Sequence, residues 1–193
     1  MDTVSIPQWT SQGVLPPVNQ TAPTSAERSP YRVSLTDLVL RFATSPARQA
    51  ILDGVLRYRS ALHAVGLDRG FQWLDGSFLE NVESIEKRDP RDVDIVTFFH
   101  PPDGRTQESL VRDSPRLFNH VHAKEDYHVD AYFVQLDGAA PEPLVAQSAY
   151  WYSLWSHRRN EQWKGYLQIG LSPADDPVAK ANLVEMTQQG DRP

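Results

Sequence analysis

Short apolar segments of strand type alternate with helix-type segments along most of this chain, and this alternation constrains the fold more than any other feature. Ser45-Pro46 is a typical helix start, and apolar residues at helical spacing follow it as far as Gly66. We expect strands over residues 71–75, 93–99, 126–135 and 165–171. We expect helices over residues 34–42, 45–66, 107–121, 143–157 and 172–188, with the helix over 107–121 interrupted near Pro115. The pattern predicts a mixed α/β (α+β) domain with a sheet of about four to five strands flanked by helices.

The first part of the chain differs from the rest. Residues 1–31 contain five prolines among Ser, Thr, Gln and Asn, and show no apolar period. This composition predicts a Pro-rich arm that is extended or disordered, with a strap packed along the domain as one form of the extended case. Residues 32–189 are then expected to form a single domain.

Composition removes several classes of function. The chain has no cysteine, which excludes disulfides, thiolate metal sites and cysteine nucleophiles. The net charge of −6 argues against an extended DNA-binding surface. No apolar run approaches the roughly 20 residues of a membrane helix, and the first residues lack the basic and apolar regions of a secretory signal. We therefore expect a cytoplasmic protein without a membrane partner, whose oxygen-rich side chains favour Mg²⁺ or Mn²⁺.

Three aspartates are the candidate metal ligands. Asp92 and Asp94 flank one residue of an expected strand, so they project from the same face about 6.5–7 Å apart. Asp130 lies on the next expected strand and can join them if the two strands pair. Carboxylates placed in this way repel one another unless a cation lies between them. Three such groups suffice for a two-metal site.

Gly76-Ser77 is the candidate phosphate-binding motif. It follows an expected strand and precedes residues 78–81, which we expect to form the first turn of a helix. The N–H groups at a helix N-terminus bind phosphate, glycine allows close approach to the backbone, and serine adds a donor. Asp75 is expected to cap the same helix.

Together these motifs resemble the DNA polymerase β-type nucleotidyltransferase superfamily. More narrowly, the chain is similar to small bacterial nucleotidyltransferase-like proteins of unassigned substrate in the segments Trp73-Leu74-Asp75-Gly76-Ser77-Phe78, Pro90-Arg91-Asp92-Val93-Asp94-Ile95-Val96, Val129-Asp130, Trp155-Ser156-His157-Arg158-Arg159 and Lys164-Gly165. Fourteen residues separate Ser77 from Asp92, slightly more than the superfamily pattern has. The resemblance implies an enzyme that uses Mg²⁺ or Mn²⁺ to transfer a nucleoside monophosphate from a nucleoside triphosphate. ATP is the expected donor, and the acceptor is a protein, an RNA or a small molecule.

The resemblance also implies roles for individual residues. Catalysis and metal binding fall to Asp92, Asp94 and Asp130, and nucleotide binding falls to Gly76, Ser77, Lys87 and Arg158. Further candidates for phosphate or acceptor contacts are Arg88, Arg159 and Lys164. Small members of the superfamily often occur in bacterial toxin–antitoxin or phage-defence modules, which implies a cognate protein or RNA partner encoded nearby.

Other interpretations remain open at the level of the sequence. Gly76-Ser77 taken alone is typical of an ordinary turn, and Asp92 with Asp94 is typical of a solvated strand edge. A catalytically silent nucleotide-binding or regulatory partner protein would keep the same fold. A metal-dependent phosphohydrolase or nuclease would also need clustered carboxylates, although the net acidity argues against it.

Overall fold

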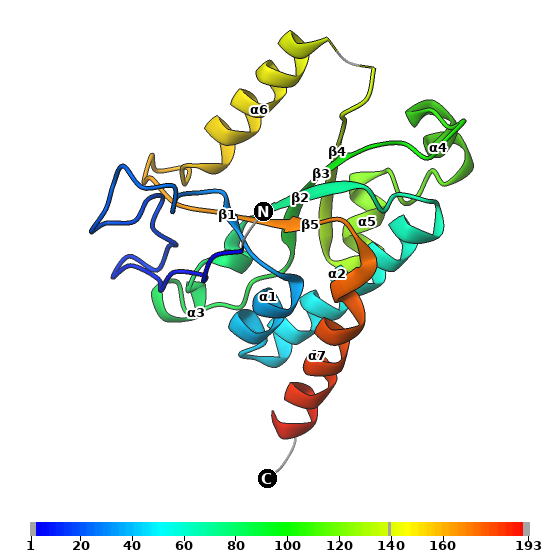
Figure 1. Ribbon diagram of the computed structural model, residues 1–193. Helices are drawn as coiled ribbons and strands as arrows, with labels where there is room; N and C mark the ends of the chain where they lie inside the picture. The colour runs from blue at the N-terminus through cyan, green and yellow to red at the C-terminus, as the bar shows by residue number, and fades with distance from the viewer. Residues whose placement is uncertain (1–2, 139, 191–193) are drawn as a thin grey trace.

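The computed structural model describes residues 3–138 and 140–190, and its centre is one five-stranded sheet of order β1-β5-β2-β3-β4 (Figure 1). The strands are β1 (Tyr31–Arg32), β2 (Gly70–Asp75), β3 (Val93–Phe99), β4 (Val129–Gln135) and β5 (Leu167–Gly170). The helices are α1 (Leu35–Phe42), α2 (Pro46–Ala64), α3 (Val82–Ile85), α4 (Gln107–Asp113), α5 (His120–Tyr127), α6 (Pro141–Trp155) and α7 (Asp176–Gly190), with short 3₁₀ turns η1 (Ser77–Leu79) and η2 (Pro173–Asp175). The expected mixed α/β fold is confirmed. None of the helices in the described residues combines the length and apolar character needed to cross a bilayer.

Strand pairing decides which side chains meet. β2 pairs antiparallel with both β3 and β5, whereas β3 runs parallel to β4 and β1 runs parallel to β5. In this register Asp75 of β2 lies opposite Asp94 of β3, which in turn lies opposite Asp130 of β4. Residues at matching positions on neighbouring strands project from the same face. The sheet therefore carries these three aspartates side by side on one face.

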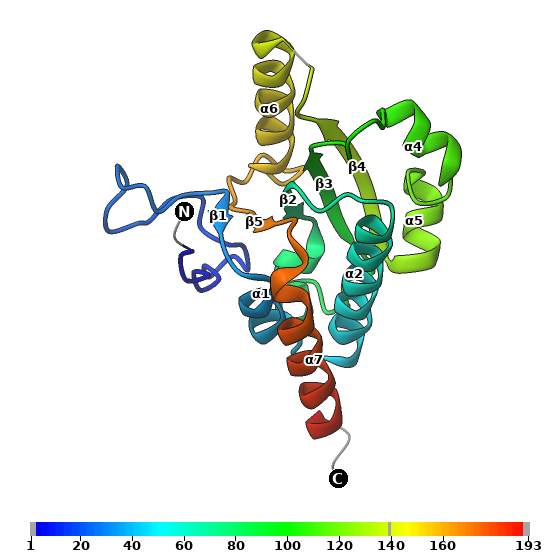
Figure 2. The ribbon, with the colours of Figure 1, turned by 45° about the vertical axis from the view of Figure 1, so that its right-hand side comes forward.

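The two faces of the sheet are covered differently. Helices α1, α2 and α7 lie together on one side, and α6 stands on the other (Figures 1 and 2). On the first side the buried Arg59 of α2 donates to Gln72 Oε1 of β2 at 2.7 Å and pairs with Asp176 of α7. On the second side Trp151 of α6 packs on Tyr132 of β4, with ring centroids 4.9 Å apart. Tyr132 shares a face with Asp130, so α6 stands over the face that carries the aspartates.

Helix starts follow the expected capping chemistry, but one helix boundary differs. Ser45 accepts a hydrogen bond from the backbone N–H of Arg48 and Pro46 begins α2, as predicted. The expected interruption of the helix near Pro115 is confirmed, because α4 ends at Asp113 and α5 begins at His120. The expected strand start at residue 126 is wrong, because α5 extends to Tyr127 and His128 ends it in a left-handed conformation with φ of 59°. β4 therefore begins only at Val129.

The N-terminal segment is a packed strap. The indole N–H of Trp9 donates to the backbone oxygen of Leu79 at 2.7 Å, and the N–H of Asn81 donates to the backbone oxygen of Gly13 at 2.8 Å. Further along, the N–H of Gly165 donates to the backbone oxygen of Leu15 at 2.8 Å. The strap thus holds both the segment after Gly76-Ser77 and the segment before β5. Its end, β1, is part of the sheet, so the arm is not separate from the domain.

Candidate functional site

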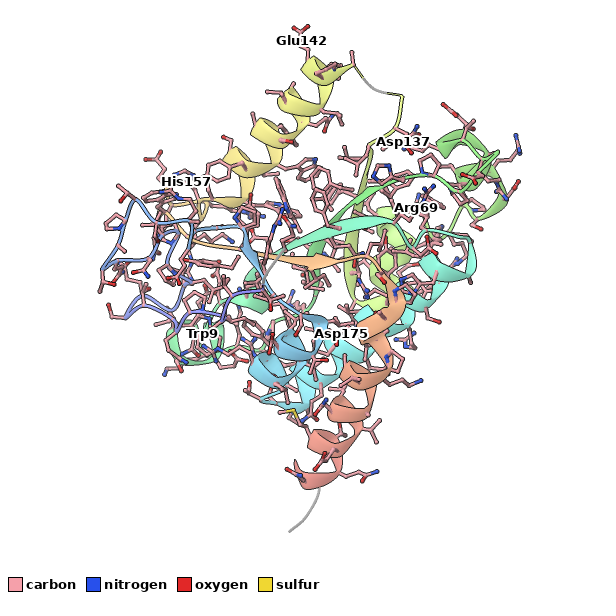
Figure 3. All side chains as sticks on the ribbon, in the orientation of Figure 1. Trp9, Arg69, Asp137, Glu142, His157 and Asp175 are labelled. Carbon is pink, nitrogen blue, oxygen red and sulfur yellow. The ribbon has the colours of Figure 1, made fainter. Side chains whose placement is uncertain are left out.

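An open cavity of about 790 Å³ lies where β2 ends and β3 and β4 begin. The cavity brings together six of the seven predicted site residues, namely Gly76, Ser77, Asp92, Asp94, Asp130 and Arg158. Lys87 is outside the lining, on an exposed turn with a φ of 55°. Its neighbour Arg88 lines the cavity instead, with Arg159 and Lys164. The C-terminal end of α6 forms one wall of the cavity. Figure 3 shows His157 just beyond that end and Glu142 at the N-terminal end of the helix.

The predicted aspartates form an acidic row, which we define as Asp92, Asp94 and Asp130. Asp92 directly precedes β3, and Asp94 and Asp130 face each other across the β3–β4 ladder. Burial, then the charges of Asp92 and Asp130, raise the pKa of Asp94 to about 6. The Oδ1 atom of Asp130 is buried and has no hydrogen-bond partner among the described residues. The row therefore holds more negative charge than its protein surroundings neutralise.

Gly76 is required by its contact with Asp94. Its φ is 88°, and a Cβ atom at this position would lie 2.6 Å from Asp94 Oδ2. A glycine here therefore lets the turn after β2 lie directly against the carboxylate. The expected helix after this turn is wrong, because Ser77 begins only the three-residue 3₁₀ turn η1. Phosphate binding at this turn would rest on the N–H groups of Gly76 and Ser77 and on the Ser77 hydroxyl, without the dipole of a helix.

Asp75 does not cap a helix but belongs to a buried charge cluster, defined here as Asp75, Glu80, Arg158 and Lys164. The Nζ atom of Lys164 lies 2.7 and 2.8 Å from the two carboxylate oxygens of Asp75 and 3.2 Å from Glu80 Oε1. Arg158 Nε donates to Glu80 Oε2 at 2.8 Å, and Arg158 Nη2 contacts the same oxygen. Asp75, Glu80 and Lys164 are 4–7% exposed, so the cluster is largely buried, and its four members form the part of the cavity wall beside Gly76-Ser77.

The protonation of this cluster is set by two opposing effects. Burial raises the pKa of Asp75 to about 7, and Lys164 opposes the rise. Burial alone would lower the pKa of Lys164, but Asp75 and Glu80 outweigh burial and raise it. The raised pKa of Asp75 favours a neutral carboxyl group, whereas the raised pKa of Lys164 favours a charged ammonium group. We assign the ionised form, because Lys164 donates to both carboxylate oxygens of Asp75 and is held by Glu80 as well.

Lys124 of α5 is the cation nearest to the acidic row. Its Nζ atom lies 2.5 Å from Asp92 Oδ2 and 4.0 Å from Asp130 Oδ2. The hydrogen bond to Asp92 and the neighbouring carboxylates raise the pKa of Lys124, so it is charged at neutral pH. The Lys124 side chain is half-exposed, in contrast to the buried Lys164.

The chemistry of the acidic row fits a divalent cation. Asp94 and Asp130 supply carboxylate oxygens on one face, and within the described part of the chain one oxygen of Asp130 lacks a hydrogen-bond partner. In residues 3–138 and 140–190, however, no group of three or more His, Asp or Glu side chains is already arranged around a metal position. The Asp92 carboxylate is instead taken by Lys124, so an ion that uses all three carboxylates would have to displace that ammonium group.

Sequence reasoning missed two parts of this site. Lys124 lies where we expected loop or the beginning of a strand, and no motif distinguishes it. Lys164 was a candidate phosphate contact, but its burial and its bond to Asp75 make it part of the structure beneath the turn. A buried carboxylate requires a cation as a partner. An isolated acidic residue on a buried segment, such as Asp75, is therefore the signal in the sequence that a lysine such as Lys164 has a structural role.

The fold and the site define an α+β domain with an acidic, open cavity at one end of a mixed sheet. The chain belongs to the family of unknown function DUF6932, whose family model matches residues 7–170. The matched range includes the strap, the buried charge cluster and the acidic row. Neither a curated protein nor a solved structure matches the chain.

Proposed function

We propose that this protein is a nucleotidyltransferase that moves a nucleoside monophosphate from ATP or another nucleoside triphosphate to a hydroxyl of a protein, RNA or small-molecule acceptor. The acceptor oxygen bonds to the α-phosphorus, the bond to the β-phosphate breaks, and pyrophosphate leaves. The observation that carries the proposal is the contact of Gly76 with Asp94, which lies opposite Asp130 in the sheet register. The turn that carries Ser77 thus lies against carboxylates suited to Mg²⁺ or Mn²⁺. These are the two elements needed to hold a triphosphate beside a metal ion.

The proposed role of each residue follows from its position in the cavity. The N–H groups of Gly76 and Ser77, with the Ser77 hydroxyl, would bind the β- and γ-phosphates. Arg88 and Arg159, which line the same cavity, would bind outer phosphate oxygens or the acceptor. Arg158 would position Glu80, because its guanidinium is already bonded to that side chain. A divalent ion held by Asp94 and Asp130 would stabilise the charge on the reacting phosphate and lower the pKa of the acceptor hydroxyl.

The shape of the cavity supports an acceptor larger than water. The cavity is open to solvent and its wall includes the exposed side chains of Tyr150 and Leu154 on α6. An apolar or planar group of a substrate can pack on this wall while its phosphates lie at the turn. In a cytoplasmic setting, a cognate protein or RNA encoded nearby is the acceptor or regulator that we propose.

Transfer of label from the four α-³²P nucleoside triphosphates to candidate acceptors tests the proposal. We expect Mg²⁺-dependent labelling that falls on the order of a hundredfold or more in Asp94→Ala, because the reacting phosphate loses its charge stabilisation. Asp103→Ala is the matched control, since Asp103 is an aspartate exposed outside the cavity. Equal labelling by the wild-type protein and Asp94→Ala would contradict the proposal.

One observation favours a second candidate function, a nucleotide-binding regulatory protein without turnover. The Lys124–Asp92 ion pair occupies a carboxylate that a metal-dependent enzyme would use. Calorimetry that detects nucleoside triphosphate binding, together with no transfer to any acceptor, would favour this candidate.

A further inference from the structure

Lys124 is held beside the acidic row by the packing of α5. The N–H of His128 donates to the backbone oxygen of Lys124 at 3.0 Å, and β4 begins at the next residue. Ala123 is completely buried, and Arg57 donates to the backbone oxygen of Asp126 at 2.9 Å. These contacts fix the helix backbone on both sides of Lys124. The backbone of Lys124 is therefore held beside the row, and its Nζ atom reaches Asp92 from there.

The Lys124 ammonium pairs with one carboxylate of the row and lies near a second. It lies 2.5 Å from Asp92 and 4.0 Å from Asp130, and in the described residues both of its carboxylate contacts belong to the row. His120, also on α5, faces Asp130 with Nδ1 3.6 Å from Oδ1, beyond hydrogen-bond distance. The ammonium group therefore occupies the space beside two of the three carboxylates that would hold the ions of a two-metal site.

Charge balance agrees with this geometry. When all three carboxylates of the row are ionised, they carry three negative charges. Before a nucleotide binds, one divalent ion together with Lys124 would neutralise them, whereas two divalent ions together with Lys124 would leave an excess of positive charge. A cation that is already in place repels a second cation brought to the same carboxylates.

We propose that Lys124 replaces one of the two metal ions, so that the acidic row binds a single divalent ion on Asp94 and Asp130. This inference rests on the proposed function for the presence of the metal. It adds that the chain supplies the second positive charge itself. The lysine would then keep Asp92 neutralised in every turnover, with no need to recruit a second ion.

Titration with Mn²⁺ alone, followed through the EPR signal of free Mn²⁺, tests the inference without any enzyme assay. We expect the wild-type protein to bind one ion per chain and Lys124→Met to bind two. Loss of the lysine charge should also tighten binding of the first ion on the order of tenfold. Lys124→Arg keeps the charge and should still bind one ion. Lys87→Met removes an exposed lysine outside the cavity and should match the wild-type protein.

The outcomes separate the two proposals. Two ions in the wild-type protein, or the same number in Lys124→Met as in the wild-type protein, would overturn the role of Lys124 and leave nucleotidyl transfer possible. No bound Mn²⁺ in either protein would overturn both the role of Lys124 and the metal site. The expected change from one ion to two, with no transfer from any nucleoside triphosphate, would support Lys124 and refute the transferase.

Discussion

The buried charge cluster and the acidic row lie at the same cavity, yet their carboxylates differ in how fully they are paired with cations. In the cluster, Lys164 contacts both Asp75 and Glu80, and Arg158 completes the coordination of Glu80. In the row, the half-exposed Lys124 pairs with Asp92 and lies 4.0 Å from Asp130, and among the described residues one oxygen of Asp130 has no hydrogen-bond partner. This difference indicates that the cluster stabilises the fold, and it supports the proposal that the row binds a cation.

Loss of Lys164 should have the largest effect on stability. Lys164→Met would leave Asp75 and Glu80 buried without their shared cation, which we expect to lower the free energy of unfolding by about 3–5 kcal/mol. Urea denaturation measures this change. A loss below about 1 kcal/mol would mean that the cluster is not the structural unit described here.

Gly76→Ala should have the next largest effect. The positive φ and the displacement of Asp94 Oδ2 together should lower stability by about 2–3 kcal/mol. Gly104→Ala is the matched control, because Gly104 has a φ of 74° and nothing within 4 Å of the added Cβ. Its loss should be limited to the backbone strain, about 1–2 kcal/mol. Equal losses of stability at the two glycines would show that the contact of Gly76 with Asp94 does not contribute to the effect of the substitution.

Asp94→Asn should stabilise the protein, and the gain should depend on pH. The pKa of Asp94 is about 6 in the folded protein and about 3.9 in an unfolded chain, so ionisation is disfavoured by folding. The wild-type protein therefore loses stability as pH rises from about 4 to about 6, and the variant does not. Thermal unfolding at pH 8 should show a gain of about 1–2 kcal/mol that vanishes near pH 4. A gain that is constant with pH would contradict the raised pKa.

Lys124→Met should have the smallest effect on stability. Its ion pair with Asp92 is half-exposed, so we expect a change of at most about 1 kcal/mol in urea denaturation without added metal. A loss as large as that of Lys164→Met would mean that the row and the cluster do not differ in the way described above.

The spacing of residues in the sequence predicted which aspartates lie together, although Asp130 is on a different strand from Asp94. The strand over residues 93–99 has the predicted bounds, and its period of two places Asp92 and Asp94 on one face. Asp130 joined them because consecutive strands commonly pair, as β3 and β4 do here. These inferences need only local sequence patterns and the assumption that consecutive strands pair.

The cations of the site could not be predicted in the same way. Lys164 reaches Asp75 across 89 residues of sequence, because the segment before β5 folds back and is held by the strap. Lys124 reaches Asp92 only because α5 extends to Tyr127 and docks beside β4. Both contacts depend on how whole elements pack, and local sequence patterns carry little information about that packing.

Calorimetric titration with non-hydrolysable analogues of the four nucleoside triphosphates tests the central claim most directly, because it needs no acceptor. We predict that at least one analogue binds in the presence of Mg²⁺, that Asp103→Ala binds it equally well, and that Asp94→Ala weakens binding on the order of a hundredfold. Binding of none of the four analogues, or equal binding by Asp94→Ala and the wild-type protein, would contradict the claim that the acidic row and the Gly76 turn form a metal–triphosphate site.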